Sequence, residues 1–197
     1  VHVPLTIGFL IITKFFYSII NDPEFSLQIF PFLCGLIQIP LIAILGKQLT
    51  NKHSIGLIMA FFLVFSPELS IYSLRVKPYT LDSLITICLI LAHVSWLKYN
   101  KFTHYNQFCI IAIFALLFSS TSIIASFILV NLPVVMKYIK DKNIKNIIIQ
   151  TIGYNISIFL VYYFLLRHQS NPMMKAYWSN EFINLKELKY FFFFISN

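Results

Sequence analysis

The stretch from Ser66 to Asp82 holds the densest set of residues that could bind or react with a ligand. It reads SPELSIYSLRVKPYTLD, with Arg75 and Lys77 one residue apart and Pro78 directly after Lys77. Proline suits the first turn of a helix, because the N–H that it lacks would have no intrahelical partner there. We therefore expect a helix to begin at Pro78. Its free N–H groups, its dipole and the two cations would together attract an anion such as a phosphate.

A second interpretation of the two cations needs no ligand. Basic residues at the ends of membrane helices commonly extend along the apolar surface to lipid headgroups, and Arg75 and Lys77 would do so equally well. Asp82, one helical turn after Pro78, could pair with either cation, and such a pair would be structural. Residue types and spacing leave both interpretations open.

Polar residues elsewhere carry weaker signals. His2, Asp22 and Glu24 precede the first long apolar run, where they could serve an acceptor or a loop, and the two carboxylates could also assist a metal. The five histidines have no metal-ligand spacing and the three cysteines form no CxxC pair, so no zinc site or disulfide framework is predicted. No Walker, Rossmann, GxSxG or HExxH motif is present. We expect no cofactor, and a need for a divalent metal stays open.

The composition shows which solvent must surround these residues. Of the 197 residues, 58% are hydrophobic and 11% are charged, and the apolar residues occur in blocks long enough to cross a bilayer. The net charge of +8 comes mostly from lysines clustered directly after apolar blocks, which favours topology signals over nucleic-acid binding. We therefore predict an all-α, polytopic, multi-pass membrane protein whose partner is the lipid bilayer and which binds no nucleic acid.

The apolar blocks predict a single transmembrane domain. The first block, residues 5–20, is interrupted by Lys14, and its polar residues fall within an arc of about 160°, so we expect a helix lying in the membrane interface. Six membrane segments follow, at residues 30–45, 55–71, 81–97, 108–118, 123–136 and 147–166. An outer segment over 167–189 and the start of a further helix over 190–197 complete the expected domain. Single polar residues within the segments, which are Gln38, Asn131, Gln150 and Asn155, are expected to bond between helices.

Short basic loops predict the orientation, because Lys and Arg collect on the cytoplasmic side. Such loops lie near Lys52, Lys101 and Lys142, and a single crossing by residues 108–136 would put the last of them opposite the other two. This run should therefore enter the membrane and return, turning at Ser119, Ser120, Thr121 and Ser122, whose hydroxyls can satisfy backbone groups freed there. The outer face would then hold residues 1–27, 66–80 and 167–189.

Three local sequences resemble those of the polytopic GT-C glycosyltransferases, in particular bacterial relatives of protein O-mannosyltransferases and lipid A aminoarabinose transferase. His2-Val3-Pro4-Leu5 is similar to the family's His-Pro-Pro-Leu start of an interfacial helix. Asp22-Pro23-Glu24-Phe25 leads into a span that ends Leu45-Gly46-Lys47, much like the family's acidic-aromatic start and Leu-Gly-Arg exit. Ser66-Pro67, Tyr72-Ser73 and Lys77-Pro78-Tyr79 are similar to its Ser-Pro, Tyr-Ser and Arg-x-Tyr pattern. The resemblance covers residues 1–136 well and the remainder only in hydropathy.

The resemblance implies a glycosyltransferase that takes a sugar from a polyprenyl phosphate carrier and passes it to a lipid, glycan or protein acceptor. Transfer would occur at the extracytoplasmic face of a bacterial inner (cytoplasmic) membrane and serve the cell envelope. Lys77 and Tyr79 match the basic and aromatic positions of the family pattern, which implies a donor-phosphate role there. Leu74-Arg75 stands where relatives often carry Gln-Glu, which leaves the role of Arg75 open. The family's catalytic carboxylate lies before the His-x-Pro-Leu segment, so the base is expected upstream of Val1 and the chain is expected to be a fragment.

A transporter or flippase of a lipid-linked glycan or another anionic solute is the alternative function. An inverted repeat, or broken helices with polar residues converging at mid-membrane, would favour it. The sequence shows no convincing repeat. A purely structural membrane subunit is a third class that the residue types leave open.

Overall fold

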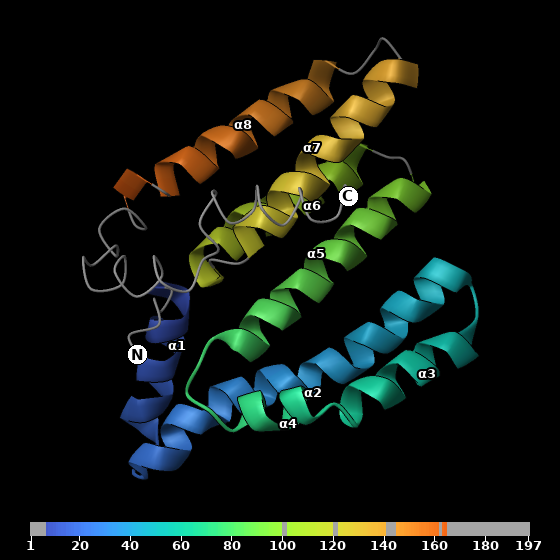
Figure 1. The fold of residues 1–197 in the computed structure, drawn as a ribbon. Coiled ribbons are helices and arrows are strands. Elements are labelled where there is room, and N and C mark those ends of the chain that lie inside the picture. Colours follow the sequence, from blue (N-terminus) through green and yellow to red (C-terminus); the bar gives the residue numbers. More distant parts are fainter. Residues whose placement is uncertain (1–6, 100–101, 120–121, 141–144, 162, 165–197) are drawn as a thin grey trace, which may run out of the picture. The chain divides into compact units, whose positions relative to one another are not determined.

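The computed structural model describes residues 7–99, 102–119, 122–140, 145–161 and 163–164. These residues form eight α-helices and no strand, which confirms the all-α prediction (Figure 1). The helices are α1 (Ile7–Ile19), α2 (Pro23–Thr50), α3 (His53–Val64), α4 (Pro67–Ser73), α5 (Tyr79–Tyr99), α6 (Phe102–Phe118), α7 (Ser122–Lys140) and α8 (Lys145–Val161). Leu5–Phe159 forms one compact unit and the two chain ends form another. The arrangement below is that of Leu5–Phe159.

Two helices are long and apolar enough to cross a membrane, namely α2 and α5. They are neighbours that run parallel, because Gln38 in α2 bonds to Thr80 and Ser83 near the start of α5, and Gln48 accepts a hydrogen bond from Ser95 near its end. The ends of α2 and α5 therefore face the same way. The basic residues at the end of α2 and at the end of α5, Lys47 and Lys98, consequently lie at one end of the pair.

A bend divides the predicted segment 55–71 between α3 and α4, whose axes differ by 60°. Pro67 causes the break, because its ring disfavours helical backbone at Ser66 and it has no N–H to continue the ladder. The Ser66 hydroxyl then accepts a hydrogen bond from the N–H of Leu69 and caps α4. With the bend, α3 and α4 could make a third, broken span.

Close glycine contacts hold α3 and α4 against α2. A Cβ at Gly56 would lie 2.2 Å from the carbonyl oxygen of Ala43, so only glycine allows α3 to approach α2 this closely. A Cβ at Gly35 would lie 3.1 Å from the Cβ of Ser73, which shows that α4 also rests directly on α2. These contacts fix α4 beside the beginning of α5.

The run from residue 108 to residue 136 is divided into two helices. α6 ends at Phe118 and α7 begins at Ser122. α5, α6 and α7 are successively antiparallel. The His93 ring of α5 packs on the Phe108 ring of α6, and the Tyr105 hydroxyl of α6 donates to the Val130 carbonyl of α7. The Ser122 hydroxyl donates to the carbonyls of Ser119 and Ala115, and the Ser122 N–H donates to the Ser119 hydroxyl. The predicted break and its hydroxyl bonds are confirmed at these two serines, whereas Ser120 and Thr121 lie outside the described residues.

α1 packs through a stripe of Gly8, Phe9 and Thr13. Phe9 contacts the ring of Phe30 in α2, and Gly8 lies against Phe118 at the end of α6. α1 therefore lies at the end of the bundle where α5 begins. Thr13, one of the polar residues in the predicted arc of residues 5–20, is buried, and its hydroxyl donates to the Phe9 carbonyl within the helix, which satisfies it there. Lys14 is exposed, and the interfacial position of α1 stays a prediction.

Polar side chains join α8 to α6 and α7. Asn155 and Asn131 exchange amide hydrogen bonds, and Gln150 donates to Asn106. With Gln38, these contacts confirm the interhelical role predicted for the four amides. α8 ends at Val161, and the predicted outer segment 167–189 and further helix 190–197 lie outside the described residues.

Candidate functional site

The loop between α4 and α5 brings Lys77 onto an aromatic pair. The Lys77 Nζ lies 5.5 Å from the centre of the Tyr79 ring, within the range of a cation–π contact. Tyr72, in α4, meets the Tyr79 ring edge to face with centroids 4.9 Å apart. The pair links the end of α4 to the start of α5 and gives Lys77 a fixed platform.

α5 begins one residue later than predicted. The Asp82 N–H donates to the Pro78 carbonyl, so Pro78 is the capping residue rather than the first helical residue. The Lys77 N–H donates to the Arg75 carbonyl at 2.8 Å. This bond keeps the residues before Pro78 in a turn, so the helix starts only after Pro78. The N–H groups of the first turn, at residues 79–81, have no intrahelical acceptor and remain available for an anion.

The two cations are differently placed. Lys77 is half-buried and Arg75 is exposed. Within the described part of the chain, neither forms an ion pair with a carboxylate. Lys77 thus presents an ammonium that no carboxylate neutralises, beside a helix start.

A cavity of about 160 Å³ with a mixed apolar and polar lining lies beside the Tyr79 ring, and we call it the polar cavity because it contains the polar groups that the other cavity lacks. Its lining comes from α2, α3, α4 and α5 and comprises Gln38, Leu63, Ser66, Glu68, Leu69, Tyr72, Tyr79, Thr80 and Ser83. Gln38 is fully buried and closes one wall, because its amide donates to the Thr80 carbonyl at 2.7 Å and accepts from the Ser83 hydroxyl at 2.8 Å. Glu68, Thr80 and Ser83 were not singled out from sequence. Glu68 and Thr80 lie within the stretch 66–82, which was singled out for Arg75 and Lys77.

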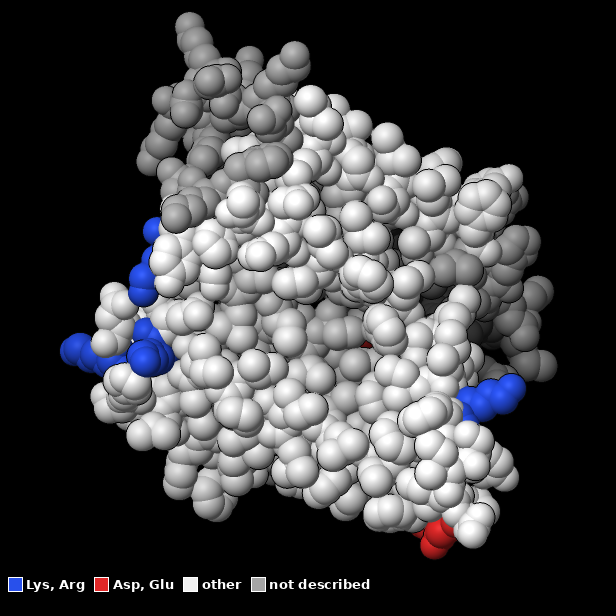
Figure 2. All heavy atoms as spheres, turned by 180° about the vertical axis from the view of Figure 1, so that it is seen from behind, with Lys and Arg blue, Asp and Glu red and all other residues white. Residues whose placement is uncertain are grey.

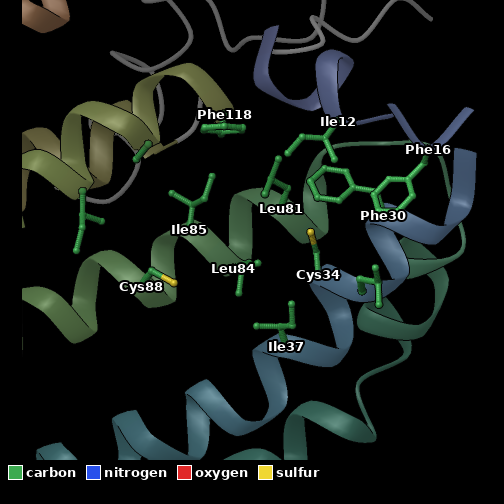
Figure 3. Close-up of a pocket in the computed structure, with 13 residues that line it drawn as sticks. Ile12, Phe16, Phe30, Cys34, Ile37, Leu81, Leu84, Ile85, Cys88 and Phe118 are labelled. Atoms are coloured by element: carbon green, nitrogen blue, oxygen red, sulfur yellow. The ribbon is translucent and has the colours of Figure 1, made fainter. Parts of the chain in front are cut away.

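A second cavity, of about 450 Å³, is almost entirely apolar (Figure 3). Ile12 and Phe16 from α1, Phe30 and Cys34 from α2, Leu84 and Ile85 from α5 and Phe118 from α6 surround one open space in the figure. The lining also includes Leu33, Ile37, Leu81, Cys88, Ile111 and Ala115. No charged side chain is among the residues that line it.

The two cavities border different faces of α2 and α5. On α5, Thr80 lines the polar cavity and Leu81 lines the apolar one; on α2, Gln38 lines the polar cavity and Ile37 the apolar one. Neighbouring residues on a helix point in directions about 100° apart, so each helix gives a different face to each cavity. In the chain, Lys77 comes just before Thr80 and Leu81, the residues of α5 that line the two cavities. A molecule with an apolar tail, an anionic group and a polar head has a matching surface for each part.

The other predicted site residues have different environments. Asp22 caps α2, because its Oδ1 accepts hydrogen bonds from the N–H groups of Glu24 and Phe25 at 2.9 and 3.1 Å. Glu24 is exposed and its carboxylate accepts from Gln28 at 3.4 Å. Neither lines a cavity described above, and His2 lies outside the described residues. Among the residues that the structure describes, no three His, Cys, Asp or Glu side chains gather as metal ligands would.

Figure 2 shows Lys and Arg side chains at two opposite edges of one face. The broad surface between these edges is white apart from one small acidic spot in a central hollow. Many large apolar side chains of the described helices are exposed, such as Leu57, Phe62 and Ile124, which are 68 to 70% exposed. An apolar belt between two polar edges suits a bilayer.

Comparison with known families identifies a membrane-enzyme family. The family described as dolichyl-phosphate-mannose-protein mannosyltransferase matches residues 2–166. The match confirms the resemblance to membrane glycosyltransferases of the GT-C type that the motifs indicated. No curated protein and no solved structure matches the chain.

Proposed function

Because the chain belongs to the dolichyl-phosphate-mannose-protein mannosyltransferase family, we propose that it binds a polyprenyl phosphate sugar as the donor. The sugar would be transferred at the extracytoplasmic face of a bacterial cytoplasmic membrane. The family supports a membrane glycosyltransferase in general. The acceptor would be the hydroxyl of a lipid, glycan or protein.

One observation carries the proposal, namely that Lys77 lies over the Tyr79 ring, which lines the polar cavity, one helical turn before Leu81, which lines the apolar cavity. The apolar cavity offers hydrocarbon contacts to part of a polyprenyl chain. The Lys77 ammonium and the free N–H groups at the start of α5 suit the phosphate, since an ammonium and a helix N-terminus both favour an anion. Tyr79 contributes by holding Lys77, and exposed Arg75 adds positive charge nearby.

The chemistry expected of these groups is charge stabilisation. As the bond between sugar and phosphate breaks, negative charge grows on the phosphate oxygens. A positioned ammonium and helix N–H groups stabilise that charge more in the transition state than in the ground state. Removal of the acceptor hydroxyl's proton needs a separate general base.

The orientation of α5 supports the proposed extracytoplasmic face. Its 21 residues give a length of about 31 Å, close to the thickness of a hydrocarbon core. Lys98 marks one end together with Lys47, and Lys77 lies at the other. The first of these ends should be cytoplasmic by the positive-inside rule, so Lys77 should lie outside.

Replacement of Lys77 tests the proposal in the natural protein, purified into lipid nanodiscs. Lys77→Ala should weaken binding of polyprenyl phosphate about tenfold to a hundredfold, because it removes a charge-assisted hydrogen bond of about 1.5 to 3 kcal/mol. Lys77→Arg should retain part of the affinity. Lys14→Ala, at an exposed lysine of α1, is the matched control and should leave binding unchanged.

The headgroup interpretation makes a different forecast for the same variants. If Lys77 only reaches lipid headgroups, Lys77→Ala at normal abundance binds polyprenyl phosphate and transfers sugar like the wild type. That result would remove Lys77 from the site. Failure of the wild type itself to bind polyprenyl phosphate would refute the proposed donor.

A further inference from the structure

The apolar cavity is a groove about two helical turns long. Its lining spans residues 81–88 of α5, 30–37 of α2 and 111–118 of α6. Each range advances by seven residues, which corresponds to about 10 Å of helix. Because α2 runs parallel to α5 and α6 runs antiparallel to it, the first residues of the α5 and α2 ranges lie beside the last residue of the α6 range. We call this the Leu81 end of the groove and the opposite one the Cys88 end.

The two ends of the groove differ in exposure. At the Leu81 end, Leu81 is 5% exposed and Phe118 is half-buried. At the Cys88 end, Ile37 of α2 and Ile111 of α6 are 49% and 39% exposed, although both line the groove. Lining residues that are exposed mark the place where a cavity is open. The groove therefore opens between α2 and α6 at the Cys88 end.

α1 covers the Leu81 end. Its Phe16 side chain borders the groove, and the Phe16 ring stacks on the Phe30 ring of α2 with centroids 6.3 Å apart (Figure 3). Gly8 rests on α6, since a Cβ at Gly8 would lie 2.2 Å from the ring of Phe118. α1 therefore bridges the two walls of the groove and closes this end.

The opening lies at membrane depth. Cys88 is the tenth of the 21 residues of α5, so the Cys88 end is near the middle of this span, where hydrocarbon surrounds a membrane helix. No charged side chain lines the groove. Lys77 precedes Leu81 by about one helical turn at the closed end. A molecule held by its anionic group at Lys77 would extend its apolar part along α5 and out through the opening.

We propose that the chain of the lipid donor leaves the groove sideways into the bilayer, between Ile37 and Ile111, while α1 keeps the Leu81 end closed. The inference rests on the proposed function, which assigns the apolar cavity to part of a polyprenyl chain. A volume of about 450 Å³ encloses only the part of a long chain that lies next to the phosphate. The rest of the chain stays in the bilayer, so long chains need the opening and short chains do not.

Narrowing the opening tests this route in the natural protein in nanodiscs. The probes are a long-chain polyprenyl phosphate, a short one whose chain fits within the groove, and the long-chain polyprenol, which lacks the phosphate. Ile111→Trp should weaken binding of both long lipids about tenfold or more and change the affinity for the short one about twofold or less. Ile110→Trp is the matched control, because Ile110 is 46% exposed and does not line the groove. It should leave all three affinities unchanged.

A disulfide tests whether α1 stays closed during binding. A Cβ at Gly8 would lie 2.8 Å from the Cγ of Phe118, and that Cγ is one bond of about 1.5 Å from its own Cβ. The two Cβ atoms would therefore lie no more than about 4.3 Å apart, within the range of a disulfide. Gly8→Cys/Phe118→Cys, with Cys34, Cys88 and Cys109 replaced by Ala, is oxidised before lipid is added, and titration of free thiols verifies the bond. The oxidised and reduced proteins should bind the long-chain polyprenyl phosphate with affinities that agree within about twofold.

The outcomes distinguish this inference from the proposal on which it rests. Loss of binding on oxidation, with recovery on reduction, would show that the chain passes under α1; the side route would be wrong and the donor proposal would stand. Equal losses for long and short chains in Ile111→Trp would overturn the side route in the same way. If Ile111→Trp excludes long chains but polyprenol binds as tightly as polyprenyl phosphate, the side route holds and the phosphate assignment fails. If no lipid binds and Ile111→Trp only lowers thermal stability, a helix of the natural protein fills the opening and both proposals are overturned.

Discussion

The two ends of α5 differ in how completely their surroundings are filled. At the end that carries Lys98, Trp96 is 2% exposed, Tyr105 and Phe108 are fully buried, and their rings pack with the ring of His93. At the end that carries Lys77, the same helix borders both the apolar and the polar cavity. Aromatic packing closes one end, and the spread of α1, α2, α4 and α6 leaves the other open.

The difference is instructive because both ends are built from similarly apolar helices. Large rings in contact exclude space for a ligand, and buried rings contribute strongly to stability. At the other end, Pro67 turns α4 across α2, and α1 packs against Phe30 and Phe118 rather than against α5 alone. The gaps left by these two short helices become the cavities. Stability is therefore concentrated at the expected cytoplasmic end and binding capacity at the expected outer end.

The largest expected effect is an all-or-none difference in labelling between the two ends. In a background with Cys34, Cys88 and Cys109 replaced by Ala, Arg75→Cys should react with a membrane-impermeant maleimide only from outside intact cells. Lys52→Cys should react only in inverted vesicles, because the basic loops should be cytoplasmic. Both positions are exposed, so access rather than burial decides the result. Labelling of Lys52→Cys from outside would reverse the orientation and remove the extracytoplasmic site.

A smaller effect should follow from filling the open end. Ile85 lines the apolar cavity from α5, and Ile85→Trp would occupy part of its volume of about 450 Å³. We expect binding of a long-chain polyprenyl phosphate to weaken about tenfold, while a short-chain analogue that does not enter the cavity loses about twofold or less. Both affinities can be measured by titration into nanodiscs.

Leu97→Trp is the matched control for this substitution. Leu97 is on the same helix, is 55% exposed and does not line the cavity. The control should leave both affinities unchanged. Equal losses for long and short chains in Ile85→Trp would show that the apolar cavity does not hold the chain.

Sequence alone predicted individual turns and polar contacts better than the paths of the short helices. The turn at Ser119 and Ser122 and the interhelical role of Gln38 follow from segment length and the cost of burying an unpaired amide. These are local or one-dimensional properties. Predicting them required no knowledge of how the helices cross.

The open end depends on properties that hydropathy does not record. The apolar run continues to Ile71, so the bend at Pro67 was absorbed into one predicted segment, and α4 was not expected. Glu68 and Thr80 are 12 positions apart and line the same cavity because α4 packs on α2 at Gly35. Likewise, Thr13 is buried because its hydroxyl bonds within α1, which its residue type does not reveal. The loop cations and Tyr79 were found from spacing and resemblance, and their donor role stays a proposal.

The smallest expected effect tests whether the spacing of α4 on α2 shapes the polar cavity. A methyl group at Gly35 would lie 3.1 Å from the Cβ and 3.3 Å from the Oγ of Ser73, so α4 must shift by a few tenths of an ångström in Gly35→Ala. The shift moves Glu68 and Tyr72 together with α4. We expect about a twofold to threefold loss of affinity for a polyprenyl phosphate hexose and no loss for sugar-free polyprenyl phosphate. Thermal stability should change little, because the gain in helix propensity of about 0.5 to 1 kcal/mol offsets the strain.

Gly153→Ala shows what the same substitution does without a neighbour. A Cβ at Gly153, in α8, meets nothing within 4 Å, so this variant should gain stability by about 0.5 to 1 kcal/mol and bind both lipids as the wild type does. Thermal unfolding and lipid titration of the two variants side by side separate propensity from spacing. Gly35→Ala with wild-type affinity for the hexose lipid would show that the polar cavity tolerates the shift of α4. An equal loss for both lipids would place the effect on Lys77 and the loop before α5 rather than on the polar cavity.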